Sequence, residues 1–376
     1  MQHHKFDTII IGAGAAGLMC AITAAIRHKK VALIDHSTKL AEKIRISGGG
    51  RCNFTNIYTK PECYSSNNPH FCKSALASYT PWHFTQLLDK HNIGYHEKTL
   101  GQLFCNDSAV DIINLLDQLC KENNVIRQMG VIIHSIEKSH NIFEVSTNIG
   151  TVKSETVVIA TGGLSIPQIG ATGFGYDIAK QFNINIVATA PALVPLTLTD
   201  AELQLFAPLS GTSFMSEVSL TNLDNKKTKA KLKFQENTLL THRGLSGPAI
   251  LQISSYWQRG DAISINVLPT LDIQEELKNN RNSNKLLSTF LAQFIAQRLS
   301  TSLCTLSNID KSLSQLSNLE ITKIHDLMHN LTLTPSGTLG YKKAEVTKGG
   351  VDCNDLFSAS MMAKNVDGLY FIGEVV

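Results

Sequence analysis

The sequence predicts an α/β fold that begins with a βαβ unit, and three observations near the amino terminus support this prediction. The apolar run Thr8–Ile11 is typical of a buried strand, and the glycine pattern Gly12–Gly17 (Gly-Ala-Gly-Ala-Ala-Gly) follows it directly. An apolar helical stretch, Leu18–Ile26, comes next. A second strand, Val31–Ile34, then leads to the acidic residue Asp35. This order of strand, glycine turn, helix, strand and acid indicates a Rossmann-like domain.

The spacing of this unit predicts a bound dinucleotide. The first glycine allows a tight turn, the second lets the backbone approach a pyrophosphate, and the third lets the helix pack against the strand. The N–H groups at the start of the helix then face the phosphates. The acid lies roughly 20 residues further on, where a carboxylate binds the ribose. An ordinary βαβ turn is the alternative. The predicted contacts are Gly12, Gly14, Ala15, Ala16, Gly17 and Asp35.

Three later segments favour FAD as the dinucleotide, and hence redox chemistry. The glycine-rich segment Ser47–Asn53 (Ser-Gly-Gly-Gly-Arg-Cys-Asn) lets backbone and side chains approach a cofactor. Thr161 and Gly162 follow the buried strand Thr156–Ala160, and a Gly-Glu pair follows the last strand, where such folds contact the ribityl chain. The predicted contacts outside the βαβ unit are Ser47, Gly48, Gly49, Arg51, Asn53, Val131, Thr161, Gly162, Gly373 and Glu374.

Composition sets wider limits. The chain has 376 residues, which is enough for two or three domains, and 43% of them are hydrophobic. A net charge of +3 permits a nucleic-acid partner without requiring one. The eight cysteines show no C-x-x-C spacing, so we expect reduced thiols, no metal site and a cytoplasmic location. The apolar stretch 7–26 contains the glycine turn, so we predict neither a signal peptide nor a membrane span.

The secondary-structure pattern of the sequence changes after Pro191, where short strand patterns and then helical patterns follow the α/β pattern of the first part. The final strand and its Gly-Glu pair belong again to the first fold. We therefore expect a discontinuous FAD-binding domain over residues 1–190 and 340–376. A β-rich domain over 191–270 and about 332–339 is inserted into it, together with a helical part over 271–331.

Four motifs resemble those of the YhiN-type flavoproteins, also called the BaiN/RdsA family of FAD-dependent oxidoreductases. They are Gly12–Gly17, Lys43–Asn53, Thr241–Ala249 and Ala344–Val351, and the resemblance runs over essentially the whole chain. It implies a Rossmann-like FAD-binding domain of the two-dinucleotide-binding-fold type, an inserted β-barrel-like domain and a small helical domain. These parts agree with the change of secondary-structure pattern after Pro191.

Finer strings resemble a branch of this family from enteric-type bacteria: Asn68–Leu76, His96–Cys105 and Ile253–Trp257. The resemblance implies NAD(P)H-dependent reduction of a uridine of 23S rRNA to dihydrouridine. Other branches imply bile-acid ene reduction or aminoacetone oxidation. Family members continue past the last Gly-Glu pair into a glycine-rich turn and helix, whereas this chain stops at Val376. We therefore expect a truncated chain, in which flavin retention and activity need to be measured directly.

Reduction of a C5–C6 double bond needs a hydride at one carbon and a proton at the other. A thiol near its ordinary pKa can serve as the general acid. Cys105, in the loop Gly101–Ser108, is the predicted proton donor, and Cys52 beside the glycines is the alternative. The competing interpretation is that both are small buried residues that fill the core.

Several residues are candidates for substrate binding. His242 and Arg243 precede a Gly-Leu-Ser-Gly-Pro loop that either orients substrate or links domains. Alternating lysines would make one face of a strand cationic toward RNA phosphates, or else protect a solvated hairpin edge. Lys43 and Arg45 either contact phosphate or RNA or belong to a solvated face. Tyr256 and Trp257 either stack on a base or pack in the core. The alternating lysines are Lys229, Lys231 and Lys233.

The preferred function is thus an FAD-dependent reductase, with NAD(P)H as the expected electron donor and rRNA as the expected substrate. One alternative is a small-molecule flavin oxidoreductase, either an enone reductase or an amine oxidase. The other is a non-catalytic flavin-containing binding factor. The choice between NADH and NADPH, and the oligomeric state, are open at this level.

Overall fold

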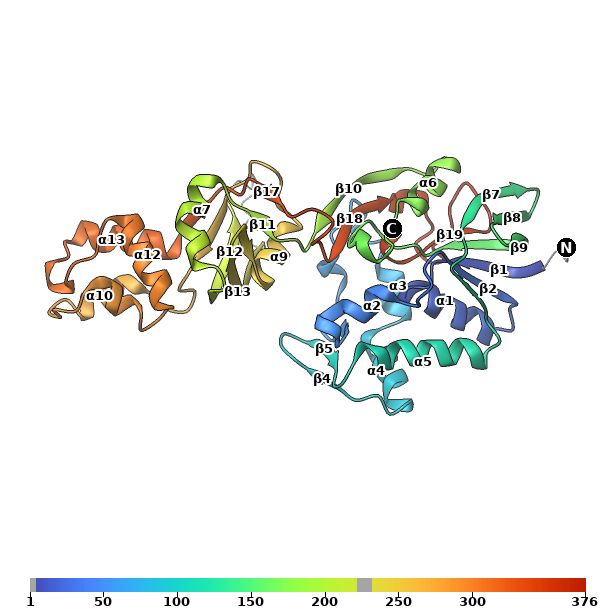
Figure 1. Cartoon of the computed structure of the whole chain (residues 1–376), viewed down its shortest axis with the longest axis horizontal. Coiled ribbons are helices and arrows are strands. Elements are labelled where there is room, and N and C mark those ends of the chain that lie inside the picture. The colour runs from blue at the N-terminus through green and yellow to red at the C-terminus, as the bar shows by residue number, and fades with distance from the viewer. Residues whose placement is uncertain (1–4, 222–231) are drawn as a thin grey trace. The chain divides into compact units, whose positions relative to one another are not determined.

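The computed structural model describes residues 5–221 and 232–376 and divides the chain into two compact units (Figure 1). The discontinuous unit comprises residues 1–189 and 349–376, and the inserted unit comprises residues 190–348. The chain passes between them in β10 (Ile186–Ala192) and β18 (Val346–Val351), which pair as a two-stranded sheet. These crossings lie within ten residues of the expected boundaries at 190 and 340.

The discontinuous unit is built on a seven-stranded mixed sheet. Its parallel part consists of β6, β2, β1, β9 and β19, and β8 and β7 extend it in antiparallel fashion. Strand β9 pairs with β8 through its first half and with β19 through its second half. The bounds are β1 Lys5–Ile11, β2 Val31–Asp35, β6 Ile126–Met129, β7 Ile133–Ser139, β8 Ile142–Thr147, β9 Gly150–Ile159 and β19 Leu369–Phe371.

Both faces of this sheet are covered, which explains the continuous apolar run of β1. Ile10 packs with Leu18 in one hydrophobic cluster, while Ile9 and Ile11 pack with Ile178 in another. Figure 1 shows α1 and α5 on one side of the sheet and α6 on the other. The helices of this unit are α1 Ala15–Ile26, α2 Glu42–Ile46, α3 Lys73–Ser78, α4 Pro81–Lys90, α5 Ala109–Glu122 and α6 Phe174–Gln181.

A small antiparallel sheet follows the second glycine-rich segment. Strand β5 (Gln102–Cys105) is its central strand, and β3 (Asn53–Asn56) and β4 (Tyr95–Glu97) flank it. A short 3-10 turn, Ser47–Gly50, leads into β3. This sheet therefore fixes the position of the glycine loop relative to the segment that carries Cys105.

The inserted unit contains an antiparallel seven-stranded sheet in the order β16-β15-β12-β13-β14-β11-β17. Its two edge strands are consecutive in sequence and are joined by residues 334–336, so the sheet must curl until its edges approach each other. This is the expected barrel-like form. The bounds are β11 Leu196–Thr197, β12 Ser213–Leu220, β13 Lys233–Thr241, β14 Gly244–Ser246, β15 Ile263–Asn266, β16 Leu331–Leu333 and β17 Gly337–Thr338.

The helices of the inserted unit share one hydrophobic core with its sheet. Leu303 and Ile321 belong to the same buried cluster as Val218 and Ile265. The segment expected to form a separate helical part is therefore continuous with the β-rich part. The helices are α7 Asp200–Phe206, α9 Pro248–Ser254, α10 Ile273–Asn279, α11 Leu287–Leu291, α12 Gln297–Ser307 and α13 Asn318–His329.

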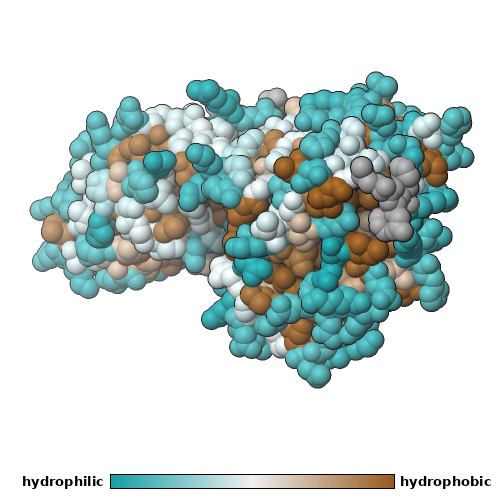
Figure 2. Space-filling model, turned by 45° about the vertical axis from the view of Figure 1, so that its right-hand side comes forward, coloured by the Kyte–Doolittle hydropathy of each residue, from teal (hydrophilic) through white to brown (hydrophobic). Residues whose placement is uncertain are grey.

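Figure 2 shows hydrophilic residues interspersed with smaller hydrophobic patches on one face. Within residues 5–221 and 232–376, no helix combines the length and apolar character that crossing a bilayer requires.

Candidate functional site

The three glycines of the first turn meet different surroundings. A Cβ on Gly12, whose φ is +107°, would lie 2.4 Å from the carbonyl oxygen of Ala160. A Cβ on Gly17 would lie 1.8 Å from the carbonyl oxygen of Gly12. A Cβ on Gly14 would meet no protein atom within 4 Å, although Gly14 caps the amino terminus of α1. The protein itself requires two of the glycines, and the middle one leaves space at a helix start suited to phosphate.

Asp35 lies beside this turn at the carboxyl end of β2. Its Oδ2 accepts a hydrogen bond from the Ala13 N–H at 2.6 Å, and its Oδ1 accepts one from the Ser37 N–H at 2.7 Å. The Val131 N–H donates to the Asp35 carbonyl at 2.9 Å. The predicted ribose carboxylate and Val131 are thus brought together beside the glycine turn. Because each carboxylate oxygen accepts more than one hydrogen bond, Asp35 retains capacity for ribose hydroxyls.

Two further segments reach the same edge of the parallel sheet. Thr161 and Gly162 follow β9, and Gly373 and Glu374 follow β19, which pairs in parallel with β9. A Cβ on Gly373 would lie 2.7 Å from the Cβ of Ala16, so this last turn packs against the start of α1. Segments from both ends of the chain therefore meet where dinucleotides bind in doubly wound folds.

Two observations at this edge are compatible with the predicted binding of FAD. The Oγ1 of Thr161 is buried and has no hydrogen-bond partner within the described structure. Gly162 and Gly49 have φ values of +74° and +69°, and a Cβ on either would meet no protein atom within 4 Å. An unsatisfied buried hydroxyl and open backbone positions are suited to a polar ligand.

An ion pair that sequence patterns did not reveal also lies in this region. Lys43 Nζ pairs with the carboxylate of Glu374 and donates to Ser165 Oγ at 2.6 Å. Ser165 Oγ in turn donates to Glu374 Oε1 at 3.0 Å. From the sequence, Lys43 either contacts phosphate or RNA or belongs to a solvated face. In the structure it joins the segments that follow β2, β9 and β19. No local spacing could have predicted this, because Lys43 and Glu374 are far apart in sequence.

The second glycine segment adopts three consecutive left-handed residues, with φ values of +58°, +69° and +87° at Gly48, Gly49 and Gly50. A Cβ on Gly48 would lie 2.7 Å from a ring carbon of Phe104. Such values favour glycine strongly. Arg51 and Asn53 follow and are exposed. The sequence Ser-Gly-Gly-Gly thus forms a tight loop that presents backbone and polar side chains.

With this geometry in place, comparison with known proteins identifies the family. The family model described as "HI0933-like protein Rossmann domain" matches residues 6–376. The chain belongs to this family. It is similar to ribosomal RNA dihydrouridine synthases of Escherichia coli and Haemophilus influenzae. The first is 48% identical over 375 residues (99% of this chain, 92% of the relative), and the second 41% over 378 residues (98% and 92%).

A more distant relative is a 3-dehydro-bile acid delta(4,6)-reductase of Clostridium scindens, which is 25% identical over 385 residues, or 98% of this chain and 92% of the relative. The predicted resemblance to YhiN/BaiN-type proteins and the predicted Rossmann-like fold are confirmed. This HI0933-like protein is an enzyme, an FAD-dependent oxidoreductase.

The structure of this HI0933-like enzyme places both predicted catalytic thiols in the core beside the second glycine loop. The Cys105 N–H donates to the Arg51 carbonyl at 2.9 Å. Cys105 is fully buried, and burial, followed by the charge of Cys52, raises the pKa of its thiol to about 12. Burial also raises the pKa of the Cys52 thiol. Both thiols therefore keep their protons at neutral pH, and their catalytic role stays a prediction.

The predicted substrate residues belong to the inserted unit. His242 and Arg243 are exposed in the turn between β13 and β14, where the Arg243 carbonyl accepts from the Leu198 N–H at 3.2 Å. Lys233 is exposed on β13, which lies between β12 and β14 in the sheet, and its Nζ pairs with Glu217 Oε1 at 2.7 Å. Lys229 and Lys231 lie outside the described residues. Their contact with RNA stays a prediction.

The aromatic pair Tyr256 and Trp257 is tied to the core. Trp257 is buried and donates from Nε1 to the Asp261 carbonyl at 2.9 Å. The ring of Tyr256 stacks on that of Phe234. These contacts support core packing rather than base stacking at Trp257.

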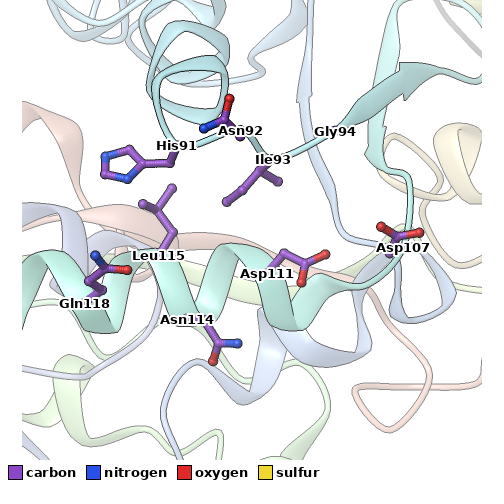
Figure 3. Close-up of a pocket in the computed structure, with 9 residues that line it drawn as sticks. All are labelled: His91, Asn92, Ile93, Gly94, Asp107, Asp111, Asn114, Leu115 and Gln118. Carbon is purple, nitrogen blue, oxygen red and sulfur yellow. The ribbon is translucent and has the colours of Figure 1, made fainter.

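A surface pocket of about 350 Å³ lies between the end of α4 and the start of α5 (Figure 3). Asp107, Asp111 and Asn114 line one side of it, and His91 and Ile93 line the other. None of its lining residues belongs to the predicted FAD contacts. The pocket is therefore separate from the glycine turns that are predicted to bind the cofactor.

Proposed function

We propose that this enzyme reduces a uridine of 23S rRNA to dihydrouridine, with NAD(P)H as the electron donor. The observation that supports this most is the 48% and 41% identity, over nearly the whole chain, to two ribosomal RNA dihydrouridine synthases. The bile-acid reductase covers the chain equally but is only 25% identical. An rRNA substrate implies a cytoplasmic location.

The residues of the discontinuous unit would hold FAD along the edge of its sheet. The start of α1 would bind the pyrophosphate, Asp35 the ribose, and the turn at Gly373 the ribityl chain. Bound FAD would supply the hydride chemistry. Ser47, Gly48 and Gly49, with Arg51 and Asn53, would approach the cofactor from the second glycine loop. The Lys43–Glu374 pair would keep the last turn in place.

The protein must also supply a proton to the second carbon of the reduced bond. Cys105 Sγ–H is the proposed donor, and Cys52 Sγ–H the alternative. Their raised pKa values keep the proton on sulfur until a basic carbon develops beside it. Since both thiols are buried, the glycine loop must move when the substrate binds.

RNA binding would use cationic and aromatic side chains. The discontinuous unit exposes Trp82 and Tyr58, with 72% and 65% of their surface accessible, and exposed rings can stack on unpaired bases. In the inserted unit we propose contacts from His242, Arg243 and the lysines Lys229, Lys231 and Lys233. Contacts with phosphates would make the affinity for rRNA fall as salt rises.

One experiment separates this function from its rivals. The purified flavoprotein is reduced anaerobically with NADH or NADPH, and 23S rRNA that lacks dihydrouridine is added. Flavin reoxidation is followed by absorbance, and dihydrouridine by mass spectrometry. We expect reoxidation matched by dihydrouridine.

Two other outcomes would contradict the proposal. Reduced flavin that persists with rRNA but is reoxidised by a steroid enone would indicate a small-molecule reductase, the function that the bile-acid relative favours. Flavin that neither nicotinamide reduces, and that no acceptor reoxidises, would indicate a binding factor without catalysis.

A further inference from the structure

Three side chains with metal-binding atoms converge in the inserted unit, outside every site described above. Asp272 caps the amino terminus of α10, and His325 and His329 lie one turn apart near the carboxyl end of α13. One potential ligand atom from each residue lies within 4.8 Å of the other two. We propose that Asp272, His325 and His329 bind a divalent transition-metal ion of the zinc type.

The ligand set and its spacing suit such an ion. Two imidazoles and one carboxylate are common ligands of Zn²⁺, at about 2.0–2.2 Å. A tetrahedral arrangement at that distance separates neighbouring ligand atoms by roughly 3.3 Å. The imidazole rings of His325 and His329 already lie with centroids 4.6 Å apart. Small side-chain rotations would therefore close the site without movement of the helices.

The contacts around His329 orient it as a ligand. Asn266 Oδ1 accepts from the Leu268 N–H at 3.0 Å, which fixes this atom as the amide oxygen. His329 Nδ1 lies 3.0 Å from the same oxygen and must donate to it. The lone pair is then on Nε2, which accepts only a long contact of 3.4 Å from the Ile273 N–H. A hydrogen bond from the remote ring nitrogen is the usual support for a metal-bound histidine.

The carboxylate of Asp272 also has one oxygen that can bind a metal ion. Its Oδ1 accepts the capping hydrogen bond from the Gln274 N–H at 2.8 Å, which leaves Oδ2 for a metal.

Two of the three proposed ligands border a hollow in the surface. His325 and His329 line a polar hollow of about 280 Å³ on the sheet, together with Asn330 and Lys233. Lys233 is paired with Glu217, which offsets the repulsion that its charge would exert on a cation. A water molecule can enter such a hollow as a further ligand.

This site differs from the expectation of no metal, which was based on cysteine spacing. Its ligands come from two helices that only the folded chain brings together. A bound ion would connect α10 to α13 and so stabilise the inserted unit by mass action.

The test is zinc titration of the whole flavoprotein after treatment with a chelator. All variants carry His3→Ala and His4→Ala, because these adjacent histidines in the sequence could bind metal themselves. The two test variants are Asp272→Asn, which keeps an amide oxygen for the helix cap, and His325→Ala. His134→Ala, an exposed residue of β7 in the other unit, is the matched control.

We expect the parent and His134→Ala to bind one Zn²⁺ per chain by calorimetry. Co²⁺ should give visible absorption bands typical of nitrogen and oxygen ligands in a low-coordinate site, and Zn²⁺ should raise the melting temperature. Both test variants should weaken Zn²⁺ binding by at least about 10-fold. Circular dichroism checks their folding, and Asp272→Asn carries the test if His325→Ala is unfolded. A parent that binds no Zn²⁺, or folded test variants that bind it as the parent does, would overturn the proposal.

Discussion

At Gly12 and Gly17, neighbouring backbone atoms leave no room for a side chain, whereas at Gly14 the protein leaves the space open. The same residue type therefore serves two purposes within one turn. Two glycines allow the strand and helix to meet, and the third leaves space beside the helix start, where we propose that the cofactor binds.

Alanine at each position should separate these purposes. We expect Gly14→Ala to preserve the melting temperature of the apoprotein but to weaken FAD binding by about 10-fold or more, because the new methyl group occupies phosphate space. Gly17→Ala should lower stability by roughly 2 kcal/mol or more, because its Cβ overlaps the Gly12 carbonyl. Thermal melts of apoprotein and FAD titration by fluorescence measure both effects. Equal loss of stability in the two variants would contradict this assignment.

The buried thiol at Cys105 gives a second test at the residue scale. If it donates the proton, Cys105→Ala should slow dihydrouridine formation by about 100-fold or more while FAD stays bound. Cys105→Ser, which keeps an O–H donor, is the matched control and should recover part of the rate. Single-turnover rates and the flavin spectrum are the measurements. Turnover by Cys105→Ala at the parental rate would exclude this residue from proton transfer.

Among the elements, α13 is held at its start by a capping box and an ion pair. Glu320 Oε2 accepts from both the N–H and the hydroxyl of Ser317 at 2.8 Å, and Glu320 Oε1 pairs with Lys311 Nζ at 2.8 Å. These contacts, the hydrogen bond from Lys311 foremost, lower the pKa of Glu320 to about 2. They tie the helix to the segment that precedes it.

Glu320→Gln should therefore reveal a pH-dependent contribution. Because the folded pKa lies below the ordinary value of 4.5, the stabilisation is fully present above that pH and is lost as pH falls toward 2. The melting temperature of the parent should exceed that of Glu320→Gln near pH 6, and the difference should shrink between pH 4.5 and 2. Glu137→Gln, an exposed position on β7, is the control. A difference that stays constant over this pH range would contradict the prediction.

For the whole molecule, the important feature is that all predicted FAD contacts lie in the discontinuous unit. The two points where the chain leaves and re-enters this unit are adjacent, since a Cβ on Gly349 would lie 2.3 Å from the Ala188 carbonyl oxygen. A short linker can therefore join them.

Replacing residues 190–348 with a short glycine-serine linker should yield a yellow protein that binds FAD within about 10-fold of the full chain, because the cofactor contacts and their hydrophobic clusters remain. Its affinity for 23S rRNA should fall, because the proposed contacts at Arg243 and the lysines are removed. Fluorescence titration and filter binding measure the two affinities, with the full chain as control. A folded but colourless product would show that the inserted unit is needed to hold FAD.

The sequence by itself determined the elements whose signals are local. Gly12–Gly17 with Asp35 indicated the Rossmann-like unit, because turn, helix start and carboxylate occur at a fixed spacing along a short stretch. The segment Ser47–Asn53 was identified from its own consecutive glycines, a residue type that lets the backbone approach a cofactor closely. The change of secondary-structure pattern near residue 190 likewise reflects local strand and helix periodicity.

Only the tertiary structure decided which distant side chains meet. The Lys43–Glu374 pair forms because parallel strands bring their carboxyl ends to one edge, and no periodicity encodes such a pairing. Packing likewise enclosed Cys105, which was predicted to lie in a loop but ends strand β5, and burial raised the pKa of its thiol. Asp272 reaches His325 and His329 because α10 packs against α13. Such contacts depend on the chain topology and on the packing of many residues throughout the core, so no short stretch of sequence specifies them.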